Sequence, residues 1–97
     1  MPKAPPDKNK RPNAKPLKIV TRKLGKHRAW GLYWEPWRNS PALIELEERM
    51  KPKRELDTLV HESMHHIFPD MPESVVAEKA TELAKILWGQ NYRKVSQ

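Results

Sequence analysis

The chain contains no cysteine, so neither disulfide bonds nor thiolate zinc ligands can contribute to its structure. A transition-metal site would have to use histidine, aspartate, glutamate or water. Long apolar runs are also missing, and none approaches the roughly 20 residues that a membrane-spanning helix needs. With 97 residues, the chain is expected to form one small domain. No apolar segment follows the basic N-terminus, which favours a cytoplasmic protein without a membrane partner.

Positive charge is concentrated near the N-terminus, where residues 1–28 hold ten Lys/Arg and one acid. The remaining residues hold nine Lys/Arg and eleven acids, so the basicity belongs to one end of the chain. Residues 1–16 are rich in proline and contain no large apolar side chain after Met1, which predicts a disordered basic arm. Residues 1–28 could bind nucleic acid or an acidic partner, or could serve only as a solvating tail.

Three short strands are predicted in the first half of the chain. They span residues 17–24, 28–35 and 42–47. In the second strand, Trp30 and Trp34 share one face at a period of two and are expected to lie in the core. In the third strand, small and branched apolar residues alternate with Glu45 and Glu47, which are expected to face outward.

Two helices are predicted in the second half. Pro52 suits the first turn of one helix, and Pro69 ends it. The second helix starts at Glu73 and stops at Gly89. The apolar stripes are Leu56, Val60, Met64 and Ile67 in the first helix, and Val76, Ala80, Leu83 and Leu87 in the second. The predicted fold is therefore α+β, with a small antiparallel sheet packed on two helices after the disordered basic arm.

The first helix carries the motif His61-Glu62-Ser63-Met64-His65. Histidines four residues apart project from one helix face, so both imidazoles can bind one zinc ion at about 2.0–2.1 Å. Glu62 lies at the edge of that face and could take a proton from a zinc-activated water. This pattern is typical of zinc metallopeptidases.

A third ligand is still needed, and His66 points about 100° away from the motif. The carboxylates that follow the turn are Asp70, Glu73, Glu78 and Glu82. Glu78 is favoured because its depth along an antiparallel helix matches that of the histidines, and Glu73 is the alternative. Glu82, one turn further on, suits a hydrogen bond to a ligand histidine.

The run 59–66, followed by Glu78 and Glu82, resembles gluzincin-type zinc metallopeptidases, and most closely the miniature forms of phages and prokaryotes. The resemblance covers roughly residues 40–90 and implies a zinc cofactor with Glu78 as the third ligand. It also implies a peptide or protein substrate, held by strand addition beside an edge strand, here residues 42–47. The zincin-like domain would then be residues 17–90, followed by a polar tail of residues 91–97.

A peptidase also needs a donor for the developing oxyanion. The neutral candidates outside the motif are Tyr92, Tyr33 and His27, and Tyr92 is preferred because it could fold back from the end of the second helix. These observations favour a zinc-dependent peptidase in which Glu62 is the general base. The alternative is an accessory protein associated with nucleic acid or an assembly, which uses a zincin scaffold and its basic arm.

Overall fold

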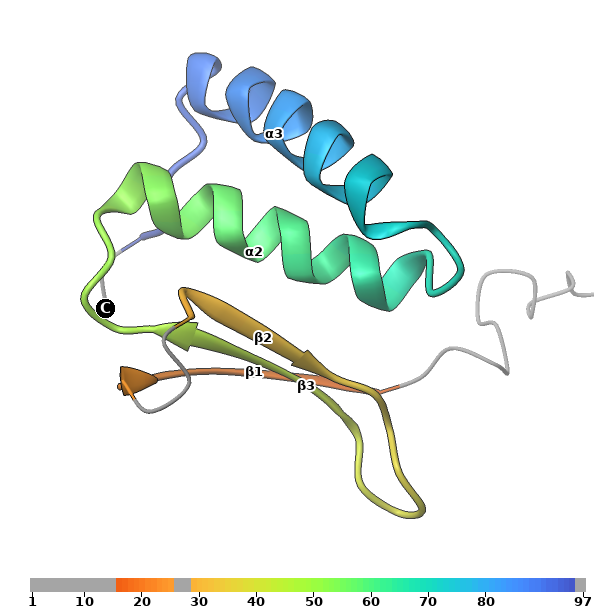
Figure 1. Ribbon diagram of the computed structural model, residues 1–97. Coiled ribbons are helices and arrows are strands. Elements are labelled where there is room, and N and C mark those ends of the chain that lie inside the picture. The colour runs from red at the N-terminus through yellow and green to blue at the C-terminus, as the bar shows by residue number, and fades with distance from the viewer. Residues whose placement is uncertain (1–15, 26–28, 96–97) are drawn as a thin grey trace, which may run out of the picture.

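A computed structural model of the protein describes residues 16–25 and 29–95, which form an α+β fold (Figure 1). The strands are β1 (Leu17–Arg22), β2 (Gly31–Trp34) and β3 (Ala42–Glu47), and the helices are α2 (Pro52–Ile67) and α3 (Glu73–Gly89). Helix α2 lies on one face of the sheet and α3 lies on α2, so the elements form three layers.

The predicted fold class is confirmed, and the helices begin and end close to the predicted prolines and glycine. The basic arm lies outside the described residues, except for Pro16. Within the described ranges, no helix is both long and apolar enough to cross a membrane.

The sheet is mixed, with β3 in the centre and the order β1-β3-β2. The predicted antiparallel pairing holds for β2 and β3, where Tyr33 lies opposite Ile44. By contrast, β1 runs parallel to β3, with Leu17 opposite Ala42. A parallel partner needs a long connection, which the residues between β1 and β3, including β2, provide. Residues 42–47, predicted to be an edge strand, are therefore the central strand, and the edge strands are β1 and β2.

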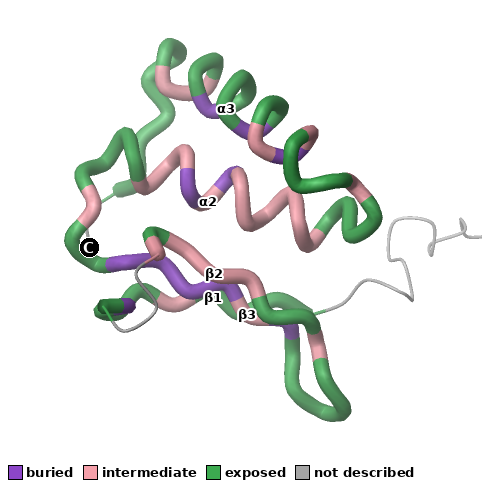
Figure 2. The backbone as a smooth tube through the Cα atoms, viewed as in Figure 1, coloured by how far each residue is buried: buried purple, intermediate pink, exposed green. Residues whose placement is uncertain are grey.

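The central position of β3 buries both of its faces (Figure 2). Ile44 is fully buried, as expected, but Glu45 and Glu47 are also buried, at 8% and 3% exposure, where outward-facing side chains were expected. Each carboxylate has partners that sequence alternation does not reveal. Glu45 accepts a hydrogen bond from the Trp34 indole at 2.8 Å and pairs with Arg22 at 3.1 Å.

The apolar contact between the helices forms around small residues. Its members are Val60, Ala80 and Ala84, with Leu56, Met64 and Leu87 packed against them. Two residues of the predicted stripes, Ile67 at the end of α2 and Leu83 on α3, are exposed instead. On α3, Ala84 takes the place that Leu83 was expected to fill. Trp30 and Trp34 are about half exposed rather than in the core.

Candidate metal centre

Three side chains meet where α2 ends and α3 begins. His61 and His65 stand on successive turns of α2, and Glu73 is the first residue of α3. The Nε2 atom of His61 lies 3.1 Å from Glu73 Oε2, and the Nε2 atom of His65 lies 2.8 Å from Glu73 Oε1. Ligand atoms of all three residues lie within 4.8 Å of one another. The short turn between the helices brings the carboxylate over both imidazoles.

This donor set fits zinc. Two imidazoles and one carboxylate are a ligand set of catalytic zinc sites, which keep a fourth position open. In a tetrahedral site with bonds of about 2.0–2.1 Å, ligand atoms lie about 3.3 Å apart. The observed nitrogen–oxygen distances are slightly shorter, so small outward shifts would admit an ion. The Glu73 side chain is 66% exposed, which leaves the centre accessible from solvent.

Glu62 lies beside this cluster and is only partly exposed. Burial raises the pKa of Glu62, and Glu73 adds to this, while His61 and His65 act in the opposite direction. The carboxylate is therefore held closer to protonation than a solvated glutamate. A carboxylate with a raised pKa beside a possible metal site is suited to proton transfer near neutral pH.

Gly31 allows the sheet to approach α2 at this point. A Cβ atom on Gly31 would lie 2.5 Å from Thr58 Cγ2 and 3.2 Å from Glu62 Cγ. Any larger residue would therefore push β2 and α2 apart or displace these side chains. Glycine in a strand often marks such a close approach. The position of Glu62 therefore depends on the absence of a side chain at Gly31.

The cluster opens into a cavity of about 580 Å³ between β2 and the helices, which we call the metal-site cavity. The lining residues are Gly31, Leu32, Tyr33, Glu35, His61, Glu62, His65, Pro69 and Glu73. Tyr33 also forms a 2.9 Å hydrogen bond with His66 Nδ1. Burial, with a contribution from Glu35, raises the pKa of Tyr33, so its hydroxyl stays neutral.

The structure brings the alternative third ligand, Glu73, to the histidines, and it does not bring Glu78 there. Glu78 and Glu82 are exposed. Each lies two residues from the buried Ala80, which places both on the opposite side of α3. Glu73 lies three residues before the buried Val76 and therefore shares its side. Depth along the helix suggested Glu78, but the rotation of α3 about its axis turns this residue away from the histidines.

Tyr92 does not reach the candidate metal centre. It is 63% exposed and lines another cavity, together with Pro52 and Leu56 at the N-terminal end of α2. Its backbone N–H bonds to Leu87 O at the end of α3, which holds it there. Of the other donors considered, Tyr33 lines the metal-site cavity, and His27 lies outside the described residues.

Sequence reasoning gave no role to Gly31 or Glu35, and it treated Tyr33 as a lesser candidate. Their proximity to the motif depends on how β2 pairs with β3, which the residue pattern does not specify. The signal that was available is the lone glycine inside the predicted strand of residues 28–35.

Comparison with protein-family models, with curated proteins and with solved structures finds no match to this chain. Fold alone does not determine function, so the function has to be inferred from the chemistry of the site residues.

Proposed function

We propose that this protein is a zinc-dependent metallopeptidase. The observation that carries the proposal is the convergence of His61, His65 and Glu73, with Glu62 next to them on α2. The sequence motif supplies only the two histidines and the neighbouring glutamate. The third candidate ligand, the Glu73 carboxylate, comes from a different helix, and its two oxygens each face one imidazole.

In this proposal, His61, His65 and Glu73 hold zinc, which when bound lowers the pKa of a coordinated water and polarises a carbonyl group. Glu62 accepts the proton of the attacking water and delivers it to the nitrogen of the leaving amine. The raised pKa of Glu62 supports the transfer to the leaving amine, because it brings the pKa of this carboxyl group closer to a neutral working pH.

The substrate would be an extended peptide beside β2. In the described sheet, β2 pairs with β3 and is an edge strand, so a peptide could add to the sheet along its outer side, next to the cavity. Tyr33 carries the only hydroxyl among the cavity-lining residues. When His66 Nδ1–H donates to the Tyr33 oxygen, the Tyr33 O–H is left to donate to a substrate carbonyl, a role that Tyr92 cannot fill from its position.

Metal analysis of the full chain, purified without chelators, tests the proposal first. We expect one zinc per chain and hydrolysis of a mixed-sequence fluorogenic peptide library. The Glu62→Gln variant should keep its zinc and lose activity by about 10²–10⁴-fold, the usual contribution of a general base. Glu82→Gln makes the same change at an exposed position on α3 and should leave both properties unaltered.

Two results would contradict the proposal. One is the absence of bound zinc, which would reduce the cluster to a pair of histidine–carboxylate contacts. The other is full activity in Glu62→Gln, which would remove the assigned general base.

A further inference from the structure

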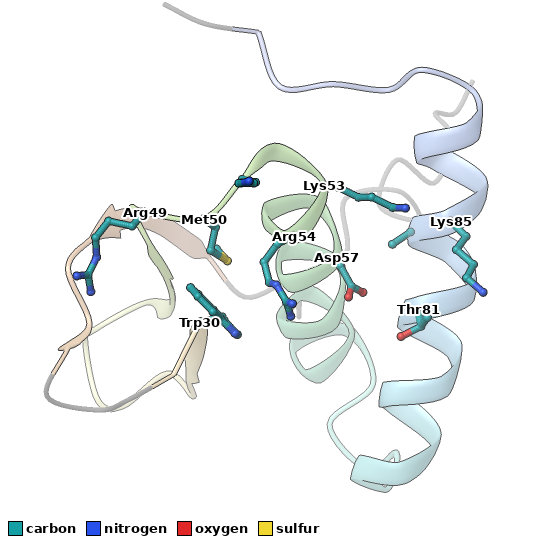
Figure 3. Close-up of a pocket in the computed structure, with 10 residues that line it drawn as sticks. Trp30, Arg49, Met50, Lys53, Arg54, Asp57, Thr81 and Lys85 are labelled. Carbon is teal, nitrogen blue, oxygen red and sulfur yellow. The ribbon is translucent and has the colours of Figure 1, made fainter.

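A second, basic cavity of about 620 Å³ lies near the first half of α2 (Figure 3). Its walls come from the residue before β2, the turn before α2, the first two turns of α2, and α3. The lining residues are Trp30, Arg49, Met50, Lys51, Lys53, Arg54, Asp57, Thr81, Ala84 and Lys85. Five of them are Lys or Arg and one is an acid, and we call this cavity the basic groove.

Most of the positive charge in the basic groove is not neutralised by the protein. Arg49 pairs with Glu47, but within the described residues Lys51, Lys53, Arg54 and Lys85 form no ion pair. All four are exposed. Arg54 lies over the Trp30 ring, with its Cζ atom 5.2 Å from the ring centroid. This cation–π contact orients the guanidinium beside the indole, as Figure 3 shows.

The basic groove and the metal-site cavity follow one another along α2. Asp57 lines the groove, and His61, one turn further on, lines the metal-site cavity. Likewise, Trp30 lines the groove, and the next residue, Gly31, lines the metal-site cavity. Arg54 and His61 are seven residues apart, so they lie on one side of the helix, separated by roughly 10 Å along its axis. An extended peptide covers that distance in about three residues.

We propose that the basic groove binds acidic side chains of the peptide substrate, about three residues from the bond that is cleaved. This inference rests on the proposed peptidase function and specifies its substrate class. Trp30 provides an apolar wall for the substrate, while Arg54 and Lys85 provide charge from the two helices. The half-exposed tryptophan, which sequence analysis placed in the core, then has a role at the surface.

The charge pattern favours a peptide over a nucleic acid. Glu35, Glu62 and Glu73 line the adjoining metal-site cavity, so the positive surface stops where the metal site begins. Even with two of these three charges offset by a bound Zn²⁺, regularly spaced phosphates would meet no excess of positive charge there, whereas a peptide can carry its negative charge at one end only. The termini of this chain do not fit the groove either, because residues 1–15 are basic and residues 91–97 contain no acid.

Binding is tested with zinc-loaded full-length Glu62→Gln protein, so that the peptides stay intact. Two fluorescent decapeptides carry three aspartates on either the N-terminal or the C-terminal side of a neutral segment, and a third carries serines instead. One aspartate peptide should bind at least about tenfold more tightly than the serine peptide, and added salt should reduce the difference. Equal binding of all three peptides would overturn the proposal.

Charge reversal provides the specific control. Arg54→Glu combined with Lys85→Glu should abolish the preference for aspartate and favour a lysine peptide instead. Both side chains are exposed, so the fold should persist, and the single variant Lys85→Glu gives the same direction if the double variant does not fold. Lys79→Glu makes the same charge change as the single variant Lys85→Glu, but at a position on α3 that lines neither cavity, and it should keep the aspartate preference.

Hydrolysis by the unmodified protein separates the two proposals. Preferred cleavage of the aspartate peptide supports both of them. Tight binding without cleavage would contradict the peptidase function and leave the basic groove in place. Equal cleavage of the aspartate and serine peptides would support the peptidase function and overturn the proposal for the basic groove. Displacement of the aspartate peptide by oligothymidine of equal charge would also overturn the proposal for the groove.

Discussion

Two groups of residues around glutamate carboxylates are constructed in opposite ways: the closed cluster, Glu47 with its hydrogen-bond donors, and the open cluster, Glu73 and Glu62 with the two histidines. Glu47, at the end of β3, is buried and accepts hydrogen bonds from Arg49 Nε at 2.7 Å and from the Leu24 amide at 2.8 Å. The bond from Arg49, followed by that from Leu24, lowers the pKa of Glu47 to about 2. Glu73 is largely exposed and faces two imidazoles, and burial raises the pKa of the neighbouring Glu62.

The difference between the clusters separates a structural role from a chemical one. The acceptors of Glu47 are filled by donors from its own chain, so this carboxylate fixes the turn after β3 and has no capacity for a ligand. The Glu73 cluster is open to solvent, and its nitrogen and oxygen atoms converge on one point. Strongly perturbed carboxylates occur in both structural networks and active sites, so geometry and access have to decide between them.

Removal of the third ligand should have the largest effect on the open cluster. Glu73→Gln deletes a charged ligand and should weaken zinc binding by at least about 100-fold, more than the loss of a supporting residue does. Glu78→Gln is the matched control on the same helix and should bind zinc normally. Competition with a chromogenic chelator measures both variants. If Glu78→Gln loses zinc and Glu73→Gln keeps it, the ligand assignment is wrong.

Distortion of the β2–α2 contact should have an intermediate effect. Gly31→Ala places a Cβ atom against Thr58 and should lower the free energy of unfolding by about 1–3 kcal/mol, the usual range for overpacking. Activity should fall further than zinc content, because Glu62 is also displaced. Urea denaturation and metal analysis measure the two effects.

The neighbouring contacts of Gly31 supply two controls for this prediction. Gly25→Ala should be harmless, because nothing lies within 4 Å of its Cβ position. Thr58→Ser removes the methyl group that clashes and should restore part of the stability lost in Gly31→Ala. Equal stability of the two glycine variants would show that β2 and α2 are not tightly apposed.

Glu47, in the closed cluster, should affect the pH dependence of stability mainly under acidic conditions. The pKa of Glu47 is lower in the folded protein than the ordinary glutamate value of 4.5, so its contribution to stability is complete above about pH 4.5. That contribution declines as the pH falls toward 2. Glu47→Gln should therefore reduce stability at pH 7, flatten the decline between pH 4.5 and 2, and leave zinc binding intact. Thermal unfolding across this range, with the exposed Glu48→Gln as control, checks the prediction.

The helical half of the fold was predictable because its signals are local. Prolines near the helix starts, apolar spacing and the motif itself all lie within short segments, and α2 and α3 follow them closely. The choice between Glu73 and Glu78 as the candidate third ligand was left open, although the sequence held the information needed to make it. Glu78 lies two residues from both Val76 and Ala80 of the predicted stripe, which already places it on the opposite face.

The sheet was less predictable because its order depends on contacts between distant residues. Nothing local indicates that β1 pairs in parallel with β3 and leaves β2 at the edge beside the candidate metal centre. The burial of Glu45 and Glu47 likewise depends on partners such as Trp34 and Arg49, which other segments supply. Alternation within a strand predicts which residues share a face, and it does not predict what covers that face.

The parallel pairing of β1 has a consequence for how the protein folds and responds to force. Strand β1 has its main contacts with β3, and most of its side chains are exposed. It can dock only after β3 has formed, and closing the long intervening segment makes that step slow compared with hairpin and helix formation. We therefore expect the amides of β1 to exchange first with solvent. A pull on the N-terminus would peel this strand away before it disturbs α2 and α3.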